Sequence, residues 1–192
     1  MILLVGQVGR EMLDREAFQE VNHQIFFSEM SKWSAEIKDA SRIPEYLSHA
    51  FHVARSGRPG PVVLSLPEDM LRDVAAVEDA PRAIPVQPAP TMEQMSEVRE
   101  MLKNAERPLM ILGGSGWSPE ACHFITHFAE QQDLPVAVTF RCQDRMDNDH
   151  SCYIGDLGIG PNPDLHLLVK ESDLLIVVGA RMGEMTTGGY QL

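Results

Sequence analysis

The fold is indicated most directly by one stretch, Gly57-Arg58-Pro59-Gly60-Pro61-Val62-Val63-Leu64-Ser65-Leu66-Pro67-Glu68-Asp69. Its glycines and prolines predict a rigid turn that carries one arginine, Arg58. The apolar run after the turn lies between chain breakers, and a run of about five β-prone residues in that setting is typical of a fully buried strand. We therefore expect the turn to place Arg58 at the edge of a sheet.

The residues before this stretch have the pattern of part of an α/β domain. Ile2-Leu3-Leu4-Val5 is a strand-like apolar run, and such strands lie inside parallel sheets with neighbours on both sides. Residues 39–55 predict a helix, with Pro44 in its first turn and Gly57 just beyond its end. Residues 9–33, rich in aromatic and polar groups, are interpreted either as a site-forming loop or as a surface loop with a few anchoring aromatics.

The residues after this stretch change character twice. Prolines and alanines recur through residues 72–90, which predicts an extended linker. From Thr91 onward, strand-like and helix-like segments alternate, and this alternation is typical of a parallel sheet with helices on its faces. We therefore expect an α/β protein in which an incomplete first domain precedes a Rossmann-like second domain.

The composition restricts the classes of function. The 192 residues carry a formal net charge of -12, which argues against binding to nucleic acids or anionic membranes because both need basic surface. The apolar runs are far shorter than the roughly 20 residues that span a bilayer. The cysteines have no CxxC spacing and their number, 3, is odd, which predicts reduced thiols in a cytoplasmic protein.

Three loops with glycine or polar residues follow predicted strands of the second domain, at residues 113–116, 139–145 and 179–183. Ligands of open parallel sheets bind at the carboxyl ends of the strands, where glycine lets a phosphate approach and Arg181 supplies a cation. The first loop lacks the third glycine of the GxGxxG fingerprint. Two interpretations stay open: a nucleotide-like ligand, or glycines that serve only tight packing.

No metal site is expected from the sequence. His123 and His127 have the i, i+4 spacing of metal ligands, but no third ligand or HExxH pattern accompanies them. The acidic residues of 144–149 lack the glycine and glutamate spacing of an EF-hand. Solvated surface is the better interpretation of both features.

Several motifs, in order and in spacing, resemble those of thiamine-diphosphate-dependent enzymes, and most closely acetolactate synthase large subunits. They are Gly6-Gln7-Val8, Ala17-Phe18-Gln19-Glu20, Ser31-Lys32-Trp33, Ser56 to Val62, Leu66-Pro67-Glu68-Asp69, Pro108 to Gly114, and Ser172 to Arg181. The resemblance covers nearly the whole chain.

The resemblance implies a domain assignment. The family has three α/β domains, so residues 1–71 would be the C-terminal part of the aminopyrimidine-binding domain, 72–90 a linker, and 91–192 a central domain truncated at its C-terminus. The domain that binds the diphosphate through Mg²⁺ would be absent, because Gly155-Asp156-Leu157-Gly158 matches a central-domain loop and not the Gly-Asp-Gly metal motif. Such a piece is expected to be inactive alone.

The resemblance also implies a chemistry. Family members decarboxylate a 2-keto acid and then either join the product to a second carbonyl, as synthases do, or protonate it, as decarboxylases do. The implied cofactors are thiamine diphosphate and Mg²⁺, with FAD or ADP at the central domain. The implied full-length form is a homodimer or homotetramer. A competing hypothesis is an FAD- or ADP-like nucleotide-binding module that is non-catalytic or regulatory.

Site residues follow from the matching motif positions. Gln19 matches the active-site glutamine with Phe18 beside it, and Lys32 matches a lysine near the substrate entrance, where an ammonium would attract a carboxylate. The positions that match contacts to the central-domain ligand are Arg58, Gly113, Gly114, Thr139, Gly155, Asp156, Gly179 and Arg181.

Overall fold

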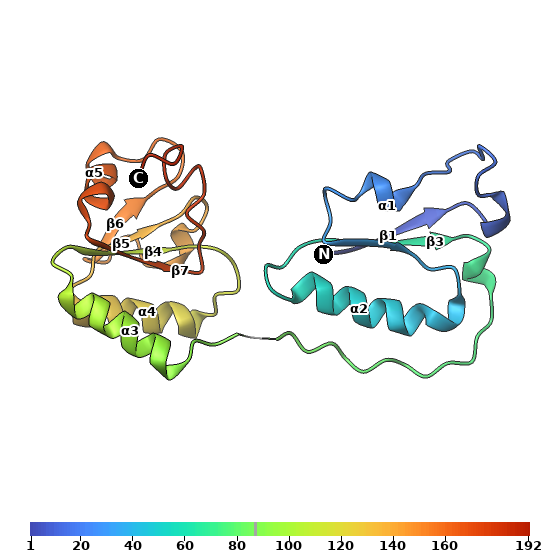
Figure 1. The fold of residues 1–192 in the computed structure, drawn as a ribbon, viewed down its shortest axis with the longest axis horizontal. Coiled ribbons are helices and arrows are strands. Elements are labelled where there is room, and N and C mark those ends of the chain that lie inside the picture. The colour runs from blue at the N-terminus through green and yellow to red at the C-terminus, as the bar shows by residue number, and fades with distance from the viewer. Residues whose placement is uncertain (87) are drawn as a thin grey trace. The chain divides into compact units, whose positions relative to one another are not determined.

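A computed structural model describes residues 1–86 and 88–192 of the protein. The chain divides into two compact units, Met1–Ala89 and Pro90–Leu192 (Figure 1). Each unit is a parallel sheet flanked by helices, so the predicted fold class is confirmed. The predicted linker includes residue 87, which lies outside the described residues, and the predicted domain limits stay predictions. Among the described helices, none is long and apolar enough to cross a membrane.

The first unit contains a three-stranded sheet and two α-helices. In chain order its elements are β1 (Ile2–Gln7), α1 (His23–Phe26), β2 (Trp33–Glu36), α2 (Ile43–Arg55) and β3 (Val62–Pro67), with 3₁₀ turns at Arg10–Met12, Ala40–Arg42 and Met70–Arg72.

The predicted buried strand, β3, is the central strand of this sheet. The strand order is β1-β3-β2, and both neighbours run parallel to β3, with Ile2 and Trp33 each opposite Val62. Val62 and Leu64 pack in one core with Ala50 and other residues of α2. A strand with partners on both sides is buried along its length, which explains its continuous apolar run.

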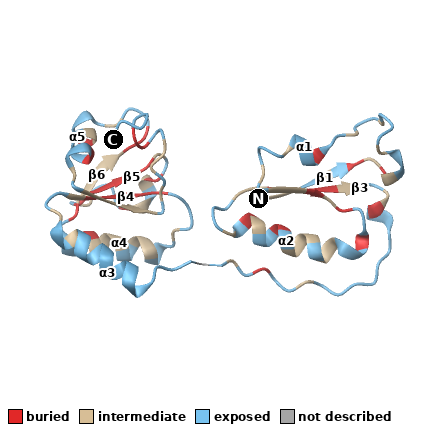
Figure 2. Cartoon of the chain, in the orientation of Figure 1, coloured by how far each residue is buried: buried red, intermediate tan, exposed pale blue. Residues whose placement is uncertain are grey.

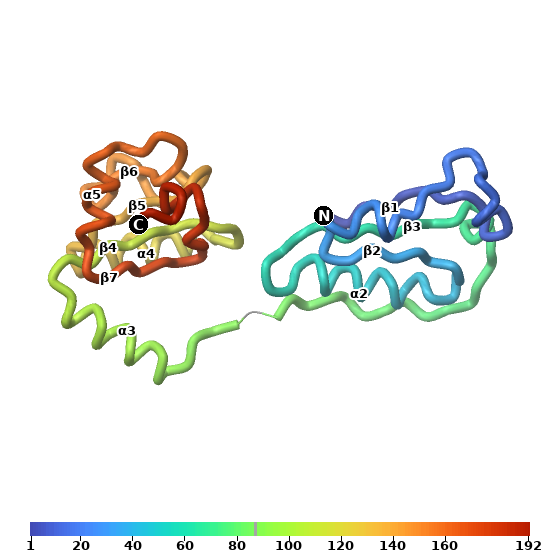
Figure 3. The backbone as a smooth tube through the Cα atoms, turned by 45° about the horizontal axis from the view of Figure 1, so that its top comes forward, coloured from blue at the N-terminus to red at the C-terminus, as the bar shows by residue number. Residues whose placement is uncertain are grey.

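Helix α2 covers one face of this sheet (Figure 1). Pro44 lies in its first turn, where a missing N–H costs nothing. The chain then turns at Gly57, whose φ of 55° favours glycine. After β3, residues 73–86 run without helix or strand alongside α2 (Figure 3). Most of this segment is exposed, but Ala83 is buried.

The second unit contains a four-stranded sheet and three α-helices. Its elements are α3 (Met92–Asn104), β4 (Pro108–Leu112), α4 (Pro119–Gln132), β5 (Val136–Val138), β6 (Tyr153–Asp156), α5 (Pro163–Glu171) and β7 (Leu174–Val178), with a 3₁₀ turn at Gln143–Arg145.

Its strand order is β6-β5-β4-β7, and every pair is parallel. Helices α3 and α4 lie on one face of the sheet and α5 on the other (Figure 1). The core follows this division, because Met110 and Leu112 pack with α4 whereas Leu109 and Ile111 pack with α5. Burial is therefore concentrated in the strands, while most of α3 is exposed (Figure 2).

Candidate functional site

The loop between β1 and α1 presents two of the three predicted catalytic residues, Phe18 and Gln19, to solvent. Phe18 is 88% exposed, and Gln19 next to it is exposed as well. Gln19 has a φ of 69°, and Asp14 and Glu16 have φ values of 62° and 56°. Non-glycine residues rarely adopt this left-handed conformation, and it is concentrated at functional sites.

This loop is held in shape by its own hydrogen bonds. The Glu20 carboxylate accepts from the backbone N–H of Asp14 at 2.7 Å and of Ala17 at 3.2 Å. These amides, above all that of Asp14, hold the pKa of Glu20 below its ordinary value. At the ends of the loop, the side-chain amide of Gln7 donates to the Val21 carbonyl at 2.7 Å. These hydrogen bonds within the loop therefore fix the conformation around Gln19 without a ligand.

A polar cavity of about 270 Å³ lies at the carboxyl edge of the first sheet, next to this loop. His23 and Ser65, both buried, are joined by a 2.9 Å hydrogen bond between Nδ1 and Oγ. Gln7 is buried too, and its Nε2 lies 3.4 Å from Oε2 of Glu36. The lining residues are Gln7, Leu13, Asp14, Glu20, Val21, Asn22, His23, Gln24, Glu36, Lys38 and Ser65.

Lys32 lies at the other end of β2, just before its first residue. Its ammonium donates to the carbonyl oxygens of Val53 and Ser56, each at 2.6 Å. These carbonyls belong to the C-terminal end of α2, where acceptors lack helical partners and a cation is favoured. The structure thus gives Lys32 a capping contact, and its role at the substrate stays a prediction.

Arg58 is exposed in the turn between α2 and β3, as the sequence predicts. The guanidinium is presented to solvent at the amino-terminal end of β3. Its contact with a ligand of the central domain stays a prediction.

The three predicted loops of the second unit do meet at the carboxyl edge of its sheet. A Cβ atom on Gly113 would clash with the Thr139 side chain, and one on Gly114 would clash with the Gly179 carbonyl. The Trp117 indole donates to the Gly113 carbonyl at 2.8 Å. Gly113, Gly114 and Gly179 therefore allow the loops to pack against one another, which is the packing interpretation of these glycines.

The same edge carries the predicted cation Arg181 and two arginines that the sequence motifs did not indicate, Arg141 and Arg145. Nη2 of Arg145 donates to the Gly114 carbonyl at 3.1 Å, and Nη1 pairs with Asp144 at 2.6 Å. Its Nε is buried and has no hydrogen-bond partner in the described part of the chain. Arg141 and Arg181 are exposed on neighbouring loops. On the loop after β4, Gly116, with φ 88°, has open space where a Cβ atom would lie.

Gly155 and Asp156 end the edge strand β6. Gly155 has a φ of 125° and lies where the register of β5 and β6 shifts, so a bulge explains this glycine. The Asp156 carboxylate accepts from Gln143 Nε2 at 2.9 Å and from the Gly158 N–H at 2.6 Å. Asp156 thus fixes the two loops beside it.

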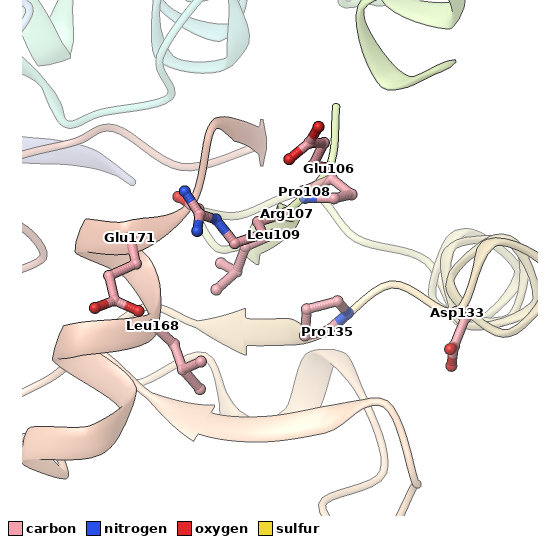
Figure 4. A pocket seen from close by; sticks show the side chains of 9 residues that line it. Glu106, Arg107, Pro108, Leu109, Asp133, Pro135, Leu168 and Glu171 are labelled. Carbon is pink, nitrogen blue, oxygen red and sulfur yellow. The ribbon is translucent and has the colours of Figure 1, made fainter. Parts of the chain in front are cut away.

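A second cavity, of about 300 Å³, lies at the opposite, amino-terminal edge of this sheet (Figure 4). Leu109, Pro135 and Leu168 supply apolar walls, and the charged groups at its rim are Glu106, Arg107, Asp133 and Glu171. An acidic rim does not suit a diphosphate. Parallel sheets bind ligands at the carboxyl ends of their strands, so the position of this cavity does not suit a nucleotide either.

The residues that the structure describes include no group of three or more His, Cys, Asp or Glu side chains placed to hold a metal ion. His123 and His127 stack with ring centroids 6.5 Å apart. His127 also approaches Glu130, with 3.6 Å between Nδ1 and Oε2.

The sequence signature of the thiamine pyrophosphate enzyme central domain matches residues 95–192. The chain belongs to this family. The family resemblance predicted from the motifs is therefore confirmed, as is the parallel α/β fold.

Curated relatives extend the match to the first unit. A glyoxylate carboligase of Escherichia coli O157:H7 is 32% identical over 100% of this chain and 33% of its own length. The large subunit of acetolactate synthase isozyme 1 of Escherichia coli K12 is 30% identical over 98% of this chain and 34% of its own. An acetolactate synthase of Mycobacterium bovis is 28% identical over 98% and 31%. The chain thus spans about a third of the length of these relatives.

Proposed function

We propose that this chain of the thiamine pyrophosphate enzyme family acts as part of a 2-keto acid carboligase of the acetolactate synthase type. The relatives named above are synthases or a carboligase, and they match the chain over nearly its full length. None of these relatives supports the competing hypothesis of a non-catalytic nucleotide-binding module. The observation that carries the proposal is the loop that presents Gln19 in a left-handed conformation beside an exposed Phe18.

In this proposal the loop residues contact the reacting partners. The Gln19 amide both donates and accepts hydrogen bonds, so it suits a carbonyl or carboxylate of the substrate. The Phe18 ring would shield that group from water. Thiamine diphosphate supplies the electron sink for decarboxylation when it is bound. Its Mg²⁺ would need ligands that no group of described side chains provides.

We further propose that the carboxyl edge of the second sheet binds FAD or ADP. The buried, unpartnered Nε of Arg145 and the exposed Arg141 and Arg181 fit a diphosphate, which needs cationic donors. Open space beside Gly116 leaves room for the approach of a phosphate. Acid extraction of the purified protein and absorbance at flavin and adenine wavelengths would identify the ligand, and Arg181→Gln should lower its occupancy.

We also propose a cytoplasmic homodimer or homotetramer. The first unit exposes large apolar side chains at Phe18, Ile25, Phe26 and Met30, at 88%, 72%, 60% and 58%. Ile25, Phe26 and Met30 lie within six residues of one another, and clustered apolar exposure marks protein interfaces. Sedimentation of the protein would test the assembly, and a monomer at micromolar concentration would contradict it.

The reaction itself is tested by product analysis. The protein, in the length in which its gene encodes it, is incubated with thiamine diphosphate, Mg²⁺ and either glyoxylate or longer 2-keto acids. We expect CO₂ and a ligated 2-hydroxy-3-oxo acid by NMR. An aldehyde without ligation would make the protein a decarboxylase, and the absence of both products would overturn the proposal.

A further inference from the structure

A row of apolar side chains lies along α2, which is a different element from the proposed catalytic loop. Ile43, Leu47 and Phe51 are spaced four residues apart, and Arg55 follows at the same interval. Residues with this spacing share one helix face, and at 1.5 Å per residue the row is about 18 Å long. Phe51 is 49% exposed. The row therefore presents a strip of apolar surface that ends in a cation.

The chain after β3 forms the opposite wall of a groove over this row. Residues 79–83 run along α2 (Figure 3), and Ala83 is buried there. The space left between helix and segment is about 570 Å³, within the usual range of small-molecule sites. Its lining residues, all within the first unit, are Ile43, Pro44, Leu47, Ser48, Phe51, Arg55, Asp79, Ala80, Pro81, Arg82 and Ala83.

The charges of the groove favour an anion, although the chain carries a net charge of -12. Arg55 and Arg82 line the groove, and neither takes part in an ion pair with any described residue. Asp79 is the acidic residue in the lining. The carbonyl groups at the end of α2, which would repel an anion, already accept hydrogen bonds from the Lys32 ammonium.

We propose that this groove binds an amphipathic carboxylate. Its apolar chain lies along Ile43, Leu47 and Phe51, and its carboxylate pairs with the guanidinium groups of Arg55 and Arg82. Apolar walls with a few placed polar groups are the usual design of such sites, and the guanidinium fork matches a carboxylate. The proposal concerns a separate part of the first unit and does not depend on the reaction proposed above.

The test compares three probes of equal chain length by titration calorimetry: decanoate, decanol and decyltrimethylammonium. We expect decanoate to bind most tightly and its affinity to fall as salt rises. Decanol binding as tightly as decanoate, or no binding of decanoate, would overturn the proposal.

Variants distinguish decanoate binding in the groove from attraction of decanoate to surface arginines in general. The double variant Arg55→Gln/Arg82→Gln should weaken decanoate binding about tenfold, since charge-assisted hydrogen bonds are lost. The matched control Arg15→Gln/Arg72→Gln removes two arginines outside the groove and should leave binding unchanged. Phe51→Ser should weaken decanoate and decanol alike. Equal affinities in all variants would contradict the site.

A lipid surface is a second source of the same chemistry. Co-sedimentation with vesicles of anionic phospholipid would distinguish it from a free carboxylate. We expect the protein to stay in the supernatant. If the wild-type protein sediments with the vesicles and the double variant does not, the groove binds a membrane surface, and the proposal is overturned.

Discussion

Arg10 and Asp69 make a two-point contact across the carboxyl edge of the first sheet. The backbone N–H of Arg10 donates to Oδ1 of Asp69 at 2.9 Å, and its Nε donates to Oδ2 at 2.7 Å. The same guanidinium contacts the Lys38 carbonyl at 2.7 Å and Asp73 at 2.8 Å. Because these residues follow β1, β3 and β2, Arg10 ties three strand ends together and fixes the start of the Gln19 loop.

The Arg10–Asp69 contact predicts a pH dependence of stability. The Arg10 side chain, and then its backbone N–H, hold the pKa of Asp69 below its ordinary value. A carboxyl group with a lowered folded-state pKa stabilises the fold above its unfolded pKa of about 4 and loses that effect as pH falls through the folded value. The difference in melting temperature between wild type and Asp69→Asn should therefore be largest above about pH 5 and shrink toward pH 3.

Asp73→Asn serves as the matched control, since Asp73 makes a single contact with Arg10. It should lower the melting temperature less than Asp69→Asn at neutral pH. A difference between wild type and Asp69→Asn that stays constant from pH 7 to pH 3 would show that the contact with Arg10 is not responsible.

The left-handed conformation of Gln19 predicts that stability and activity change in opposite directions. Gln19→Gly relieves the cost of a positive φ and should raise the free energy of unfolding by about 0.5–1 kcal/mol. It should also lower turnover, because the amide is lost. Glu16→Gly, at φ 56° in the same loop, should give the same gain in stability with turnover unchanged. Equal turnover in the two variants would remove Gln19 from the site.

The contact of Gly114 with Gly179 predicts that a substitution by alanine lowers stability much more at Gly114 than at Gly116. Gly114→Ala would place a methyl group against the Gly179 carbonyl, whereas Gly116→Ala meets no atom within 4 Å. We expect Gly114→Ala to lower the free energy of unfolding by about 3 kcal/mol or more, and Gly116→Ala by about 1 kcal/mol from its positive φ. Urea unfolding of the two variants measures this, and similar losses would mean that the loops are not packed as described.

The hydrogen bonds of Lys32 predict that its substitution lowers the stability of the fold. Lys32→Met removes two contacts to the end of α2 and should lower the free energy of unfolding by about 1–2 kcal/mol. Thermal unfolding together with the KM for the keto acid separates the two roles. A raised KM at unchanged stability would favour the predicted role at the substrate entrance over the capping role.

The main elements of the fold were predictable because they have strong local signals. The run Val62 to Leu66 and the breakers around it indicate β3, and the helical spacing of residues 43–54 indicates α2. Strands β2 and β6 were not predicted. Each has four residues, β2 contains polar side chains, and β6 contains Gly155, so neither has a clear alternation or apolar run. Pairing with a central strand, which is a tertiary effect, makes them strands.

The candidate site was predictable only in outline. Loops that follow parallel strands meet at one edge, so the grouping of residues 113, 139 and 179 follows from topology. The hydrogen bonds of Arg10 and Glu20 and the buried Nε of Arg145 were missed, because they depend on contacts that no local pattern encodes. An acid shortly after the end of β3 and an arginine shortly after β1 were the available signals for the contact of Arg10.

The most direct test of the central claim is the rate of CO₂ release from a 2-keto acid by the protein as its gene encodes it. We predict release that requires added thiamine diphosphate and Mg²⁺, falls in Gln19→Gly and is retained in Glu16→Gly. Release without thiamine diphosphate, or no release from glyoxylate or longer 2-keto acids by a folded protein, would contradict the account.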